Sequence, residues 1–339
     1  MSLTAGERID VVNIGLMLVA CAVAMVIPFE LFLFSYAILG PLHYLTEISW
    51  LHDKKYYTKG KYDAVVLLVI GLLVTLTNFS KYLELEFPQH FAGYLTYIAF
   101  LGSIVFVFVK NNFARIAGLL LIIVTSQLSE HFWLFFLVFL PTLIHVYIFT
   151  MLFMLYGALK SKSKMGVLSV VVLLLCPVLL YTVFPNTTFF GPSSYGITAY
   201  DLFRGVNRFS LSHFMNVPEQ PSEQSWNEII FHSQAGILLM RFIAFAYTYH
   251  YLNWFSKTRV IQWHKVPKAR FAVVLAIWLI SISLYIYNYS VGLQWLFFLS
   301  FLHVLLEFPL NYISVVGIGA YIRDRIFKSQ PTPAQLSKK

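Results

Sequence analysis

The sequence predicts an all-α integral membrane protein, a polytopic bundle of about ten transmembrane helices with both termini on the cytoplasmic side. Three observations lead to this fold class. First, the 339 residues are 59% hydrophobic and only 12% charged, whereas soluble domains carry about 25% charged residues. Second, the apolar residues gather in long runs. Third, positive charge collects in alternate connections between these runs.

The apolar runs define the expected spans. A hydrocarbon core of about 30 Å requires ~20 apolar residues in a helix. The first run leads directly into the second without a small-residue cleavage site, so we interpret it as a span rather than a signal peptide. Residues 1–328 are expected to form a single transmembrane domain, followed by a polar tail at 329–339. The ten expected spans are residues 10–27, 29–51, 63–79, 92–109, 113–128, 132–158, 165–184, 229–255, 271–289 and 293–320.

Lysine and arginine give the orientation. With the amino terminus inside, 20 of the 24 Lys and Arg residues fall in cytoplasmic segments. The outer side holds only Lys81, Arg204 and Arg208, and Arg241 lies within a span. This asymmetry follows the positive-inside rule and fits an even number of spans. In a bacterium, such a chain belongs in the inner (cytoplasmic) membrane. The net charge of +9 is thus a topology signal, and no nucleic-acid partner is expected.

One outer connection, about residues 185–227, is unusually long. It is interpreted either as a lid or as a connector. Ser225 and Glu228 form an S-x-x-E capping box, which predicts that the eighth helix begins there.

Polar residues within the spans are the candidate functional groups. A charged side chain at mid-membrane costs roughly 3 kcal/mol, so such residues usually face the bundle interior and serve a function. The second and tenth spans each carry an H-x-x-x-E pair, whose members share one helical face. A proline lies within four residues of the intramembrane histidines in spans two and six, and another follows Glu307, which favours a wet or ligand-filled pocket. The candidate residues are His43, Glu47, His145, Arg241, His250, His303 and Glu307.

These residues predict a metal centre. The helices that carry them are all even-numbered spans and run in the same direction, so the side chains can meet. Neutral imidazoles with carboxylates suit iron, mononuclear or dinuclear, or zinc. We therefore predict metal ligands at His43, Glu47, His145, His250, His303 and Glu307. The expected function is metal-dependent oxidoreductase chemistry, of oxygenase or desaturase style, on a hydrophobic or lipid-like substrate, with Arg241 as a candidate substrate-binding residue. No specific catalytic residue is identified.

Three other interpretations stay open. Each histidine could simply hydrogen-bond to a neighbouring helix. A secondary transporter could use the same His, Glu and Arg residues as proton or substrate sites. Haem b could be held by two histidines, which would leave both glutamates unexplained. The chain has none of the H-x-x-H-H or H-x-x-x-H boxes of membrane desaturases and hydroxylases, and the echo of His43-Tyr44-Leu45 in His250-Tyr251-Leu252 is too weak to indicate a repeat.

Overall fold

The computed structural model describes residues 3–54, 62–88, 90–126, 135–214 and 222–327, and the regular elements within them are helices. The predicted polar tail, residues 329–339, lies outside the described residues. In chain order the elements are α1 (Ala5–Val26), α2 (Pro28–Phe34), η1 (Ser35–Leu39), α3 (Gly40–Lys54), α4 (Asp63–Asn78), α5 (Ser80–Leu83), α6 (Phe91–Phe108), α7 (Asn112–Ser126), η2 (Phe135–Phe149), α9 (Thr150–Ser161), α10 (Lys164–Thr182), α11 (Ser194–Tyr200), η3 (Asp201–Phe203), α12 (Arg204–Phe214), α13 (Glu223–Phe231), α14 (Gln234–Ser256), α15 (Thr258–Ile261), α16 (Lys268–Tyr287) and α17 (Tyr289–Phe327).

The chain is an integral multi-pass membrane protein. In the described part, seven helices are long and apolar enough to cross a bilayer, or eight if the bent pair α13–α14 is counted as one span. Helices α2, η1 and α3 run together as one of these spans, and η2 with α9 forms most of another. The two remaining predicted spans correspond to the shorter apolar helices α4 and α7, of 16 and 15 residues.

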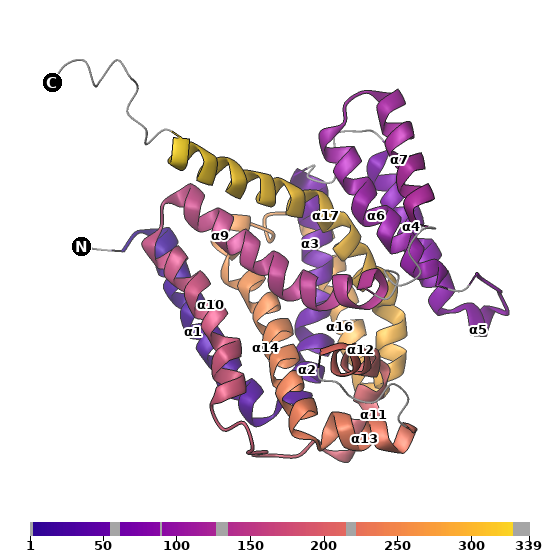
Figure 1. The fold of residues 1–339 in the computed structure, drawn as a ribbon, viewed down its shortest axis with the longest axis vertical. Coiled ribbons are helices and arrows are strands. Elements are labelled where there is room, and N and C mark those ends of the chain that lie inside the picture. Colours follow the sequence, from indigo (N-terminus) through magenta and orange to yellow (C-terminus); the bar gives the residue numbers. More distant parts are fainter. Residues whose placement is uncertain (1–2, 55–61, 89, 127–134, 215–221, 328–339) are drawn as a thin grey trace.

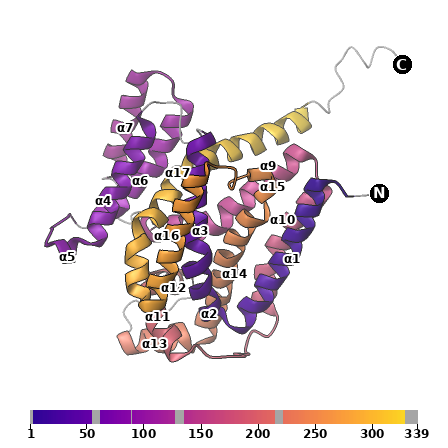
Figure 2. The same ribbon diagram turned by 180° about the vertical axis from the view of Figure 1, so that it is seen from behind.

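The bundle has two chemically different ends. The end at the top of Figure 1 holds the start of α1, the end of α3, the α9–α10 turn and the end of α17. We call it the basic end, because Lys160, Lys164, Lys257 and Arg270 lie at the helix ends there. The opposite end carries α11 and α13, with α12 just inside it, and is called the cap end (Figures 1 and 2). The long helices therefore run between the basic end and the cap end, in alternating directions along the chain.

The long connection after α10 contains helices α11, α12 and α13 rather than extended chain. The capping-box prediction at Ser225 and Glu228 is wrong, because both residues lie inside α13, whose N-cap is Ser222. After α13 the chain bends by 64° and α14 starts with Ser233 as its N-cap. A Cβ at Gly236 would lie 2.1 Å from the Ile229 carbonyl oxygen, so glycine is required at this bend.

Two apolar clusters make up the core. One is built mainly on α1, α2, α10 and α14, and the other on α4, α6 and the middle of α17. Helices α3, η2 and α17 contribute to both: Tyr44 of α3 packs in the first cluster and Leu51 in the second. The candidate histidines and glutamates lie on these shared helices and on α14, which places them where the two clusters meet.

Irregular backbone occurs next to these residues. Two π-helical stretches, η1 and η2, lie immediately before α3 and around His145, and η2 contains Pro141. Pro309 lies inside α17, two residues after Glu307. Wider π turns and prolines interrupt the i to i−4 hydrogen-bond ladder and are frequent at functional sites. The prolines near His43 and His145 are therefore accompanied by π-helical backbone, whereas α17 stays α-helical through Pro309.

Candidate metal centre

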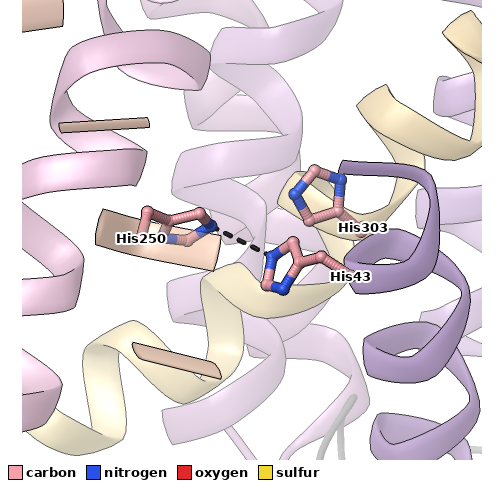
Figure 3. A group of neighbouring side chains, drawn as sticks. All are labelled: His43, His250 and His303. Carbon is pink, nitrogen blue, oxygen red and sulfur yellow. Dashed lines mark hydrogen bonds between the residues drawn. The ribbon is translucent and has the colours of Figure 1, made fainter. Parts of the chain in front are cut away.

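Four imidazoles from four different helices meet in the interior of the helical bundle. They are His43 on α3, His145 on η2, His250 on α14 and His303 on α17. None is more than 6% exposed. The Nε2 atoms of His43 and His250 are 3.0 Å apart, and those of His145 and His303 are 3.2 Å apart. Figure 3 shows His43, His250 and His303 turned toward one another from separate helices, with the first of these contacts dashed.

The spacing of these nitrogens suits a metal ion. One nitrogen from each of His43, His250 and His303 can be chosen so that all three lie within 4.8 Å of one another, and these three residues could hold a metal. Metal–imidazole bonds of ~2.0–2.1 Å place two ligand nitrogens about 3.0–3.4 Å apart at angles between 90° and the tetrahedral angle. The His43–His250 and His145–His303 pairs fall in this range, whereas the three donor atoms of His43, His250 and His303 are only within 4.8 Å of one another. To hold one ion together, these three rings must therefore move inward.

The two glutamates approach this cluster differently. Glu47 Oε2 lies 3.0 Å from His43 Nε2, the same nitrogen that faces His250. Glu307 Oε2 lies 2.9 Å from His145 Nδ1, on the far side of that ring from its contact with His303. Both oxygens are buried without a properly oriented hydrogen bond in the described structure. Buried carboxylate oxygens need a donor or a cation, so both positions favour a bound cation or protons at this centre.

Neighbouring side chains fix the rings. The Thr150 hydroxyl lies 2.8 Å from His250 Nδ1. If Nδ1 donates to this hydroxyl, the lone pair of His250 is left on Nε2, facing His43. Tyr44 stacks on His303 with ring centroids 4.4 Å apart, and its hydroxyl is 2.8 Å from that of Tyr251. These contacts hold the imidazoles in orientations that point their nitrogens inward.

Two cavities reach the centre from opposite ends of the bundle. The tyrosine chamber, of about 350 Å³, extends from the centre toward the cap end. Its lining includes Tyr36, Tyr44, Tyr247, Tyr251, Ser300, Phe297, His145, His250 and His303. The inner pocket, of about 140 Å³, extends toward the basic end. Its lining includes His43, Glu47, Thr150, His250, Asn253, Lys257 and Glu307. His250 borders both cavities, so the centre lies between them.

Lys257 lies at the basic end of the inner pocket, just after α14 ends. Burial lowers the pKa of its ammonium to about 8, and the opposing effect of the nearby Asp10 carboxylate is smaller. Desolvation disfavours the charged form of an amine. A proton can therefore leave or join Lys257 near physiological pH, at the entrance to the pocket that contains both glutamates.

Arg241 is not brought to the histidines. It precedes His250 by nine residues on α14, about 13 Å along a helix. Its guanidinium is buried and donates to the carbonyl oxygens of Phe184 and Thr187, which joins α14 to the connection after α10. The substrate-binding role assigned to Arg241 from the sequence stays a prediction, and its described partners are backbone groups at the cap end.

The side chains that support and line the site were not predicted from the sequence. Thr150 carries no distinguishing pattern, since hydroxyls inside spans are common. The tyrosines had a signal in the two His-Tyr-Leu segments: in the structure His43 meets His250 and Tyr44 meets Tyr251. The two His-Tyr-Leu segments therefore lie on helices α3 and α14, which contact each other at corresponding residues.

Comparison with known proteins gives no assignment: no family model, curated protein or solved structure shows a significant match to this chain.

Proposed function

We propose that this chain is a membrane-embedded metal-dependent enzyme, an oxidoreductase that uses non-haem iron on a hydrophobic, lipid-like substrate. The observation that carries the proposal is the buried set of His43, His250 and His303, whose donor atoms lie within 4.8 Å of one another. Three imidazoles from separate helices, brought together away from water with nitrogens facing one another, can share a proton or an ion.

The donor set favours iron. Glu47 approaches the nitrogen of His43 that faces His250, so we assign Glu47 as a carboxylate ligand beside the histidines. His ligands with one carboxylate are typical of non-haem iron sites that leave positions open for oxygen and substrate. Zinc would fit similar ligands and would instead supply a water of lowered pKa for hydrolysis. His145 Nε2, which is 3.2 Å from His303 Nε2, adds a fourth imidazole and allows a dinuclear variant.

Glu307 has a different proposed role. It touches His145 at Nδ1, whereas Nε2 of that ring faces the centre. A carboxylate behind a ligating imidazole fixes the ring and raises its basicity. We therefore assign Glu307 as a positioning residue for His145 in this arrangement. The ligand role predicted from the i and i+4 spacing of His303 and Glu307 is the alternative.

The chamber beside the centre supports a hydrophobic substrate. Its volume of about 350 Å³ falls within the ~300–1,000 Å³ range of small-molecule sites. Aromatic and aliphatic side chains make up most of its lining, and it lies inside a bilayer protein. A lipid-soluble molecule is the class that can reach it from the membrane.

Metal analysis with an optical spectrum tests this function. We expect about one or two iron atoms per chain in wild type, lost in His43→Ala and His303→Ala, and substrate-dependent oxygen consumption. If the protein instead contains stoichiometric zinc and has no redox activity, the proposed function changes from oxidoreductase to hydrolase. A Soret band would indicate haem, although the 3.0 and 3.2 Å nitrogen pairs are closer than the ~4 Å that two axial ligands of one iron require.

A secondary transporter is the second candidate, because the tyrosine chamber and the inner pocket approach the centre from opposite ends of the bundle. Alternating access uses a central site of this kind in helices interrupted by proline. Absence of bound metal together with proton-coupled uptake into vesicles would select this candidate over the enzyme.

The membrane topology proposed with this function has ten spans, with both termini cytoplasmic. The two short apolar helices α4 and α7 and the bent α13–α14 pair supply the spans beyond the seven long ones. Helix α4 would extend about 24 Å, so the bilayer must thin or the polar ends must adjust around it. The basic end then faces the cytoplasm, in agreement with the distribution of Lys and Arg.

A further inference from the structure

The hydrogen-bonding groups of the tyrosine chamber are unusual for a lipid pocket. Tyr36 and Ser300 hydroxyls are 3.2 Å apart, and Tyr44 and Tyr251 hydroxyls are 2.8 Å apart. Tyr44 also interacts by hydrogen bonding with Tyr36 and Ser300, so the four hydroxyls form one network that shares its protons. This network borders the chamber next to the candidate metal centre, and its hydroxyl protons can turn toward a ligand oxygen.

These hydroxyls lie at the metal end of the chamber. Ser300 precedes His303 by three residues on α17, and Tyr44 stacks on the His303 ring. A ligand oxygen that accepts from these hydroxyls would lie beside the imidazoles. The rest of the ligand must then extend away from the centre, toward the cap end.

The side chains of the chamber also offer no counter-charge, and a divalent ion at the centre would be balanced by the carboxylates of Glu47 and Glu307. Among the described residues that line it, none is Lys, Arg, Asp or Glu. Burying a carboxylate or phosphate without a cation is expensive, whereas a hydroxyl or carbonyl oxygen needs only a hydrogen-bond donor. The lining therefore discriminates against anionic lipids such as free fatty acids.

A second cavity continues the chamber outward. It has a volume of about 370 Å³ and lies around the end of α4, α5 and the start of α6. The two cavities share Val74, Asn78 and Phe297 in their linings. Val74 is buried and Asn78 is exposed, so the passage runs from the protein surface past Val74 and Phe297 to the centre.

We propose that the chamber binds a neutral, elongated, mostly apolar molecule with a hydroxyl or carbonyl oxygen at its inner end, and that this molecule enters between α4 and α17. This proposal rests on the proposed function, since it names the substrate class of the same site. The hydroxyl pairs hold the oxygen, the absence of charge in the described lining excludes an anion, and the passage accommodates the chain.

Binding of matched probes tests the proposal. Purified protein in phosphatidylcholine nanodiscs is titrated with radiolabelled 1-hexadecanol, hexadecanoate and hexadecane, and metal content is measured on the same samples. We expect saturable hexadecanol binding, at least tenfold tighter than hexadecanoate binding. The double variant Tyr36→Phe with Ser300→Ala should weaken hexadecanol binding severalfold and leave hexadecane binding unchanged.

The passage is tested by blocking it. Val74→Trp should abolish or strongly slow hexadecanol binding, whereas Val69→Trp, at an exposed site on the same helix, should not. Hexadecanoate binding equal to or tighter than hexadecanol binding in wild type would overturn the proposal, as would unchanged hexadecanol binding in a monodisperse Val74→Trp protein. Hexadecanol preference in protein that binds no metal would leave this proposal standing and remove the proposed function instead.

Discussion

At the scale of single residues, two glutamates of the site have different roles because they contact different atoms of the histidines. Glu47 and Glu307 both follow a histidine by four residues, and both are buried. Glu47 contacts its own-helix partner at Nε2, while Glu307 contacts His145 of another helix. Helical spacing places side chains on one face but does not select their rotamers.

The hydroxyl of Thr150 gives a test at this scale. Thr150→Val removes the partner of His250 Nδ1 while it keeps nearly the same volume. We expect the affinity for the bound metal to fall by about 10- to 100-fold, as for other supporting partners of metal ligands. Thr96→Val is the matched control, since Thr96 is buried and its hydroxyl bonds only its own helix. Metal competition titration is the measurement, and equal affinities in the two variants would contradict this role.

Lys257 predicts a pH dependence. Its folded pKa of about 8 lies below the ordinary value of about 10.4. Between these values the unfolded chain binds the proton and the folded protein does not, so stability rises with pH across this window. Below pH 8 Lys257 is charged in the folded protein, so the free energy of unfolding is lowered by the full cost of burying its ammonium group.

Lys257→Met should therefore increase the free energy of unfolding at pH 7 by about 1–2 kcal/mol, after allowance for the partial exposure of Lys257. The melting temperature at pH 7 should rise accordingly. The difference from wild type should shrink as the pH approaches 10. Lys160→Met, at an exposed position, is the control. A Lys257→Met difference that stays constant from pH 7 to pH 10 would argue against a buried charge.

At the scale of elements, close approaches fix how helices meet around the site. A Cβ at Gly40 would lie 2.9 Å from the Tyr44 hydroxyl oxygen and 3.3 Å from that of Tyr251. Glycine at the start of α3 thus leaves space for the tyrosine pair that borders the chamber. At Gly236 an added Cβ would meet backbone atoms of α13, which cannot move aside without changing the bend between α13 and α14.

Two glycine substitutions are expected to have opposite signs. Gly236→Ala should destabilise the protein by roughly 1–3 kcal/mol, because the methyl group overlaps two carbonyl groups of α13. Gly157→Ala, inside α9 with nothing within 4 Å of the added Cβ, should stabilise it by about 0.5–1 kcal/mol. Thermal unfolding in one detergent checks both. Equal effects would mean that the bend does not depend on close packing at Gly236.

At the scale of the whole molecule, the sequence predicted the membrane fold well and the site in part. Apolar runs located the helices because a bilayer demands long apolar segments. Intramembrane His and Glu residues pointed to one centre because lipid makes isolated polar groups expensive. The sequence did not predict the helices within 185–227, because short amphipathic helices lack a long apolar run. It also missed Thr150 and the tyrosine chamber, which depend on which helices touch.

The ten-span topology can be tested on the intact molecule. In a Cys21→Ala, Cys176→Ala background, Ser194→Cys at the cap end and Lys164→Cys at the basic end place single thiols at exposed positions. We expect a membrane-impermeant maleimide to label Ser194→Cys in intact cells and Lys164→Cys only after permeabilisation. Labelling of both thiols, or the reverse order, would require a different orientation or number of spans.

The most direct test of the central claim is X-ray absorption at the metal edge of the purified protein. We expect bound iron with at least three imidazole ligands at about 2.0–2.2 Å and additional oxygen scattering. The imidazole signal should be reduced in His250→Ala and unchanged in His213→Ala, which changes an exposed histidine outside the centre. Protein that binds no metal at stoichiometric level, or a metal whose ligands are unaffected by His250→Ala, would contradict it.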